Sequence, residues 1–122
     1  MLNSVVLVGY VGKDPRVRYY ESGKVQAVFS LGVSRPLKRG AEADPVTDWF
    51  SIELWGKRAE LAGSYVRKGA LLGVEGRLEF RSDTDERGQP YTIPYIAAYD
   101  FRFLGPKADS LAAQQAAAET TR

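Results

Sequence analysis

Apolar and polar side chains alternate along residues 24–34, and this pattern constrains the fold more than any other feature of the sequence. Every second residue from Val25 to Val33 is apolar, and polar or small residues occupy most of the intervening positions. Because successive side chains of a β-strand point to opposite faces, this period of two predicts a strand with one buried face. Residues 46–55 and 71–81 alternate in the same way. The pattern therefore favours a sheet protein.

Two further stretches bring the expected main strands to five. Residues 5–11 are almost continuously apolar and rich in β-branched side chains, which indicates a deeply buried strand, and residues 91–104 are rich in aromatic side chains. Residues 16–20 can extend the pairing into a hairpin. Only residues 57–68 look helical, because apolar side chains recur on one stripe and Gly69 follows as a C-cap.

A short, mostly antiparallel all-β chain with one helix between its third and fourth strands matches the five-stranded, partly open Greek-key barrel of the OB-fold. We assign this domain to residues 1–105. The polar loops at 36–45 and 82–90 are bounded by long strands, so we expect them to form protruding hairpin flaps. Residues 106–122 contain six alanines and no apolar stripe, which predicts a disordered or weakly helical tail rich in alanine and glutamine.

Residue types that are absent from the sequence exclude most enzyme classes. The chain contains neither cysteine nor histidine, which removes disulfides, thiolate nucleophiles, zinc sites of the usual kind and histidine-based triads. It also lacks a glycine-rich phosphate loop and a Gly-x-Ser-x-Gly motif. We therefore expect a protein that is not an enzyme and that uses no cofactor or metal. No signal-peptide pattern or long apolar run is present, so we expect a cytoplasmic protein without a membrane partner.

Positive charge gathers in the first third of the chain. The net charge is only +2, but residues 1–39 hold seven basic side chains against two acidic ones. This local excess indicates a region that faces phosphate groups. A solvated face without a specific role explains the charges equally well, so the charge pattern by itself leaves the partner open.

Two tryptophans share the polar face of the strand predicted at 46–55. Parity directs Phe50, Ile52 and Leu54 toward the core, and it directs Trp49 and Trp55 to the opposite face together with Ser51 and Glu53. At about 3.3 Å per residue, the two indoles lie about 20 Å apart, which leaves room for several nucleotides along a groove. Any base can stack on an indole. Burial in a second small core or a subunit interface is the alternative.

The candidate phosphate contacts are the basic residues of the first hairpin, the flaps and the later strands. They are Arg16, Arg18, Arg35, Lys38, Arg39, Lys57, Lys68 and Arg81. Arg77 shares a strand face with Glu75 and Glu79, so pairing with a neighbouring carboxylate is an alternative for it. The aromatic side chains of the last strand share one parity, and we expect them in the core or in an interface. They are Tyr91, Tyr95, Tyr99, Phe101 and Phe103.

These motifs resemble, over about residues 2–105, the bacterial single-stranded DNA-binding proteins. The resemblance rests on Asn3-Ser4-Val5-Val6-Leu7-Val8-Gly9, Gly12-Lys13-Asp14-Pro15-Arg16-Val17-Arg18-Tyr19, Asp48-Trp49-Phe50, Leu54-Trp55-Gly56-Lys57, Tyr65-Val66-Arg67-Lys68-Gly69, Gly76-Arg77-Leu78 and Phe103-Leu104-Gly105. It implies an OB-fold homotetramer that wraps single-stranded DNA without sequence preference and protects it in replication, recombination and repair. It also implies that Trp49 and Trp55 are stacking platforms.

The chain departs from this family pattern at three places. Family members often carry a tryptophan after the second strand, where this chain has Ser34-Arg35-Pro36-Leu37, and Asp83 replaces another platform. Members that recruit replication and repair proteins end in an acidic tip, whereas this chain ends Ala118-Glu119-Thr120-Thr121-Arg122, so those partners stay open. The departures keep a second hypothesis in play: a homo-oligomeric OB-fold scaffold or regulatory module with weak or lost nucleic-acid binding.

Overall fold

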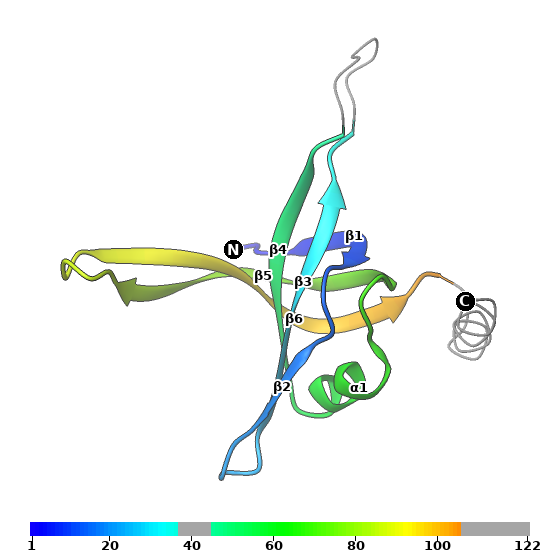
Figure 1. Cartoon of the computed structure of the whole chain (residues 1–122), viewed down its shortest axis with the longest axis horizontal. Coiled ribbons are helices and arrows are strands. Elements are labelled where there is room, and N and C mark those ends of the chain that lie inside the picture. The colour runs from blue at the N-terminus through cyan, green and yellow to red at the C-terminus, as the bar shows by residue number, and fades with distance from the viewer. Residues whose placement is uncertain (37–44, 106–122) are drawn as a thin grey trace, which may run out of the picture.

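The computed structural model describes residues 1–36 and 45–105 (Figure 1). These residues form six strands and one helix: β1 (Val5–Val11), β2 (Arg16–Tyr19), β3 (Val25–Ser34), β4 (Thr47–Trp55), α1 (Lys57–Tyr65), β5 (Leu71–Thr84) and β6 (Pro90–Phe103). The candidate phosphate contacts Lys38 and Arg39 and the tail predicted at 106–122 lie outside the described residues.

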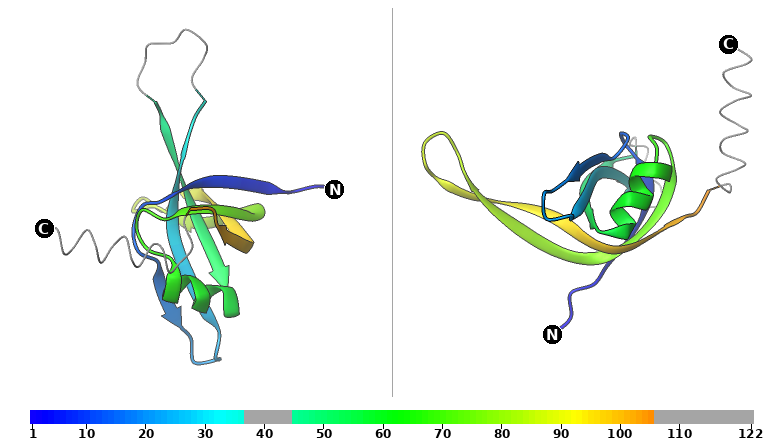
Figure 2. Two further views of the ribbon diagram at one scale, coloured as in Figure 1. Left: turned by 90° about the vertical axis from the view of Figure 1, so that its right-hand side faces the viewer. Right: turned by 90° about the horizontal axis from the view of Figure 1, so that it is seen from below.

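Hydrogen bonding joins the strands into a ring. Their order is β1-β5-β6-β4-β3-β2, and β1 also pairs with β3 at Tyr10–Gly32, which closes the barrel (Figures 1 and 2). The pairs are antiparallel except β4–β6, which run parallel at Ile52–Ile96. The predicted OB-fold is confirmed, with α1 between β4 and β5. The short β2, expected as an extension of the pairing, forms a strand of its own, so the described strands number six instead of five.

The barrel is filled by the inward side of each alternating strand. The largest of the fully buried side chains are all aliphatic: Leu31, Ile52, Leu54, Val66, Leu72, Val74 and Ile96. Leu31 and Ile52 stand at alternate positions of β3 and β4, as the period of two predicts. Because alternation buries one face of each strand, the side chains on the opposite face are available to contact a ligand or another subunit.

The helix α1 is shorter than the sequence pattern predicts. It ends at Tyr65 instead of residue 68, because Val66 takes an extended conformation and its side chain is fully buried in the core. The predicted C-cap Gly69 instead ends the following turn at φ 89°, and its N–H donates to the carbonyl of Val11. The buried side chains Ala59 and Ala62 pack α1 against the barrel.

The β5–β6 pair forms a long hairpin that projects from the barrel (Figure 1). Strand pairing includes residues 82–84 and residue 90 of the loop predicted at 82–90, and residues 85–89 form the turn between the strands. The register shifts between Glu75 and Gly76, which pair with Asp100 and Ala98 and leave Tyr99 as the extra residue of a bulge. Of the aromatic side chains expected in the core or in an interface, Phe101 and Phe103 pack against the core, whereas Tyr99 and Tyr91 lie outside it, at 54% and 42% exposed.

Candidate nucleic-acid interface

Strand register assembles the candidate site on the outer face of β2, β3 and β4. In one cross-strand row, Gln26 of β3 lies between Arg18 of β2 and Trp55 of β4. In the next row on the same face, Val28 lies between Arg16 and Glu53. Directly opposite residues of antiparallel strands point to the same face of the sheet. The cations of β2 and the indole of Trp55 therefore share one surface.

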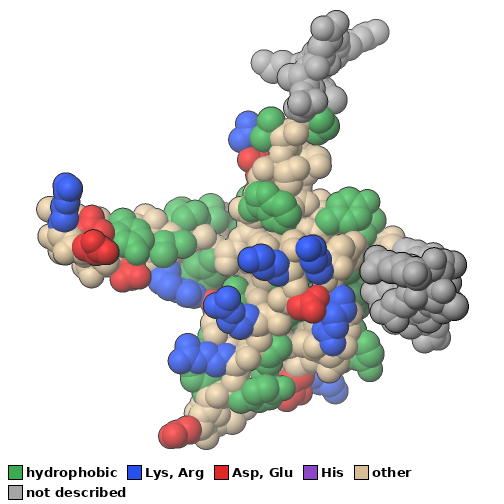
Figure 3. Space-filling model, in the orientation of Figure 1, with side chains coloured by type: hydrophobic (Ala, Val, Ile, Leu, Met, Phe, Trp, Pro, Cys, Tyr) green, Lys and Arg blue, Asp and Glu red, His purple; other side chains and the backbone are tan. Residues whose placement is uncertain are grey.

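A groove of about 420 Å³ crosses this face. Its lining residues come from four strands and the β1–β2 turn: Lys13, Asp14, Arg16, Arg18, Gln26, Val28, Phe29, Ser30, Ser51 and Arg81. Four of these side chains are basic and one is acidic. Figure 3 shows Lys and Arg side chains gathered in the middle of this view, over β2 and the adjoining barrel. The groove thus provides a concave, positively charged surface that suits a polyanion.

Trp49 lies beyond one end of this groove as an exposed flat ring. Its side chain is 62% exposed, and its strand partner in β3 is Gly32. A Cβ atom on Gly12 would lie 2.7 Å from Cζ3 of the indole, and one on Gly32 would lie 2.9 Å from the same atom. The indole of Trp49 can take this position only if residues 12 and 32 are glycines, because a side chain at either position would collide with the ring.

Trp55 is fixed by polar and aromatic neighbours. Its side chain is 45% exposed, and its Nε1–H donates a 2.7 Å hydrogen bond to Oε1 of Glu53. The ring of Tyr20 lies 5.7 Å from it, centroid to centroid, at an interplanar angle of 31°. The Tyr20 hydroxyl donates to Gln26, and the guanidinium of Arg18 lies 5.2 Å from the Tyr20 ring centroid. Arg18, Tyr20 and Trp55 thus form one layered cluster of a cation and two rings.

Arg81 is held by Glu53, a residue that the sequence analysis placed on the outer face but did not select. Arg81 Nη2 lies 2.6 Å from Glu53 Oε2, and the guanidinium lies 4.5 Å from the ring centroid of Tyr95. Hydrogen bonding to Glu53 raises the pKa of Arg81. Glu53 is only 6% exposed although its parity points it outward. Local sequence carries no signal for this burial, because its partner Arg81 comes from β5 and its parallel neighbour Ala97 from β6, both distant along the chain.

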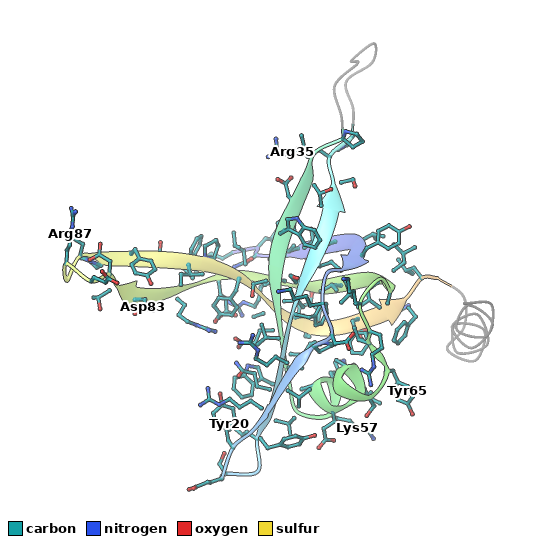
Figure 4. All side chains as sticks on the ribbon, viewed as in Figure 1. Tyr20, Arg35, Lys57, Tyr65, Asp83 and Arg87 are labelled. Atoms are coloured by element: carbon teal, nitrogen blue, oxygen red, sulfur yellow. The ribbon has the colours of Figure 1, made fainter. Side chains whose placement is uncertain are left out.

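The other candidate cations within the described residues are not part of the groove lining. Arg35 stands at the foot of the β3–β4 hairpin, where its Nε and Nη2 donate to the two carboxylate oxygens of Asp48 at 2.8 and 2.9 Å. This pairing lowers the pKa of Asp48. Lys57 belongs to α1, on another part of the surface with Tyr65 (Figure 4). Lys68 follows α1, and its backbone N–H donates to Asp14.

The structure thus brings together only part of the predicted site. Arg16, Arg18 and Arg81 share the groove between the two tryptophans, whereas Arg35, Lys57 and Lys68 lie outside its lining. Among residues 1–36 and 45–105, no cluster of three or more acidic side chains is arranged to hold a metal ion. No helix within those ranges is long and apolar enough to span a bilayer.

The barrel and its groove define a class of protein: an OB-fold module that presents flat aromatic rings and cations on one outer face. Comparison with known families gives the same class. Residues 2–104 match the model described as the single-strand binding protein family, and the chain belongs to this family.

Individual relatives cover most of the chain. Single-stranded DNA-binding protein 1 of Synechocystis sp. is 44% identical over 110 residues, which is 89% of this chain and 88% of the relative. The single-stranded DNA-binding protein of Thermosynechococcus vestitus is 46% identical over 110 residues, with the same two shares. Among solved structures, a Plasmodium falciparum SSB in complex with ssDNA is 30% identical with a TM-score of 0.76, and the match covers 86% of this chain and 96% of that one.

Proposed function

We propose that this protein binds single-stranded DNA without sequence specificity. The observation that carries the proposal is the position of two exposed indoles, Trp49 and Trp55, on the same outer barrel face as the basic groove. The names of its relatives and the single strand in the Plasmodium complex support the same function.

Stacking and charge supply the two parts of the binding energy. A base stacked on an aromatic side chain contributes about 1–3 kcal/mol, whatever the base, and cations along the groove hold the phosphates. Arg16 and Arg18 face the groove directly. Lys38, Arg39, Lys57 and Lys68 would extend the phosphate path beyond it. Arg35 already donates two hydrogen bonds to Asp48, so it can contact a phosphate only with its remaining donors or by leaving that ion pair.

We further propose that the protein acts as a homotetramer and by binding alone, without a catalytic step. The outer side of β1 supports assembly, because Val6, Val8 and Tyr10 expose 67%, 50% and 59% of their surface there. Apolar side chains exposed in a row are typical of subunit contacts. The cellular role that follows is protection of single-stranded DNA in the cytoplasm during replication, recombination and repair.

A fluorescence titration with poly(dT) tests the binding. Trp49 and Trp55 are the only two tryptophans in the sequence, so tryptophan emission, excited selectively over the seven tyrosines, reports on the proposed contacts. We expect saturable quenching, with an affinity that falls linearly with salt on a double logarithmic scale. Absence of quenching, together with no mobility shift of a labelled oligonucleotide, would contradict the proposal and favour an OB-fold scaffold instead.

A further inference from the structure

Glu53 is the one charged side chain that is buried among the residues the structure describes. It belongs to β4, two residues from Trp55, and it lies on the outer face next to the basic groove. Burying a carboxylate is costly unless it is paired and hydrogen-bonded. Both oxygens of Glu53 are used, since Oε1 accepts from Trp55 and Oε2 from Arg81.

The contact with Arg81 changes what that cation offers to a phosphate. The Nη2–Oε2 distance of 2.6 Å marks a strong, charge-assisted pair. Stacking on Tyr95 restrains the same guanidinium from another side. Arg81 is therefore a groove-lining cation whose charge is already balanced by a carboxylate that water barely reaches.

The contact with Trp55 orients a stacking surface. The indole has one hydrogen-bond donor, and Glu53 holds it at 2.7 Å while Tyr20 lies against the ring. A ring fixed in its binding orientation loses less conformational entropy when a base stacks on it. The same carboxylate thus favours stacking at Trp55 and opposes phosphate binding at Arg81.

We propose that Glu53 is a positioning residue that sets the affinity of the groove: it fixes the Trp55 indole for stacking and withholds Arg81 from the DNA phosphates. This inference rests on the proposed function. Its consequence is a site that depends more on stacking, and less on charge, than its four basic lining residues would suggest.

Two substitutions separate the two roles. Glu53→Gln removes the charge but keeps an acceptor for Trp55, whereas Glu53→Val removes both and keeps a side chain suited to a strand. In each variant Arg81, whose side chain is 53% exposed, can turn to a phosphate. We expect the slope of log affinity for poly(dT) against log salt to steepen by about 0.7 in both, the value of one added phosphate contact on a single strand.

The two variants should differ at Trp55. In Glu53→Gln we expect the fluorescence quenching at saturation to be kept and binding at low salt to tighten by about two- to fivefold, the strength of one partly exposed ion pair. In Glu53→Val we expect Trp55 to lose its share of the quenching, because its N–H no longer has an acceptor. Because the effect is read from two variants, failure of one to fold leaves the other to decide.

Two controls identify Arg81 as the cause. Adding Arg81→Gln to Glu53→Gln should return the salt slope to that of the unmodified protein, whereas Glu60→Gln, an exposed position on α1, should change nothing. Normal binding by the unmodified protein with an unchanged slope in both Glu53 variants would overturn this inference alone. Failure of the unmodified protein to bind poly(dT) would overturn the proposed function, and this inference with it.

Discussion

Two outer faces of the same barrel are built alike and charged differently. On the groove side, β4 exposes Trp49 and Trp55 beside the arginines of β2. On the other, β1 exposes Val6 and Val8, which lie opposite Glu75 and Gly73 of β5. Both faces display large apolar side chains to solvent. For β1 this corrects the expectation of a deeply buried strand, because every second side chain from Val6 to Tyr10 is exposed.

The comparison shows that exposure of a large apolar side chain does not by itself identify a binding platform. Trp49 is 62% exposed and Val6 is 67% exposed, so solvent contact does not separate them. Their neighbours do: the groove between the tryptophans has four basic lining residues, whereas the hollow beside Val6 and Val8 is mainly apolar and carries the charges of Glu75, Asp100 and Arg102. A polyanion fits the first surface, and another protein surface fits the second.

The largest expected effect comes from removing the rings on the groove side. Trp49→Ala combined with Trp55→Ala should weaken poly(dT) binding by at least about 30-fold, because each stacked base contributes about 1–3 kcal/mol. Fluorescence is lost with the tryptophans, so the affinity is measured with a labelled oligonucleotide. The protein should still unfold cooperatively, with a lower thermal midpoint, because Trp49 is 62% exposed but loss of Trp55 removes a hydrogen bond to the buried Glu53.

Tyr65→Ala is the matched control for this loss. Tyr65 is 59% exposed on α1, outside the lining of the groove (Figure 4). We expect its removal to leave the affinity within about twofold, the range of an ordinary surface substitution. An equal loss of affinity from Tyr65→Ala would mean that the DNA path does not follow the tryptophan face.

A charge placed on β1 tests the other face. Val8→Asp should dissociate the oligomer, because an unpaired carboxylate in an apolar contact is costly to bury. Light scattering measures the subunit number, and poly(dT) titration of the dissociated protein measures what the groove retains. Val46→Asp, at an exposed valine outside β1, should leave the assembly intact. If the Val8→Asp variant kept the mass of the unmodified oligomer, the β1 face would not be a subunit contact.

The barrel followed from the sequence because its strands obey a local rule. Alternation in 24–34 and 46–55 predicts both the strands and the side on which Leu31 and Ile52 are buried. The end of α1 did not follow, because burial of Val66 in the core outweighs the helical pattern that continues to Lys68. The bulge at Tyr99 could not be predicted from the sequence of β6 either, because the register depends on pairing with β5.

The candidate site was predictable only where one strand defines it. Parity within β4 is sufficient to place Trp49 and Trp55 on one face. The pairings of Arg81 with Glu53 and of Arg35 with Asp48 join residues that are 28 and 13 positions apart, and nothing in the local pattern indicates them. A count of charges treats Arg81 and Arg35 as unpaired cations, but in the folded protein each forms an ion pair with a carboxylate.

The smallest expected effect concerns the Arg35–Asp48 pair at the margin of the groove face. Its guanidinium lowers the pKa of Asp48 below the ordinary 3.8, so the pair stabilises the folded state above that value and the contribution is lost as the pH falls through the lowered pKa. Asp48→Asn should remove this acid dependence. The difference in thermal midpoint between the two proteins should therefore shrink as the pH is lowered from about 5 to below 3.8.

Asp48→Asn also tests whether an exposed carboxylate keeps its arginine from the DNA phosphates as strongly as a buried carboxylate does. Asp48 is solvent-accessible, so its hold on Arg35 is weakened by water and salt. Freeing Arg35 by Asp48→Asn should thus tighten poly(dT) binding less than freeing Arg81 by Glu53→Gln. A gain from Asp48→Asn that equals or exceeds the Glu53 variant would show that position along the DNA path, and not burial of the carboxylate, decides which arginine reaches a phosphate.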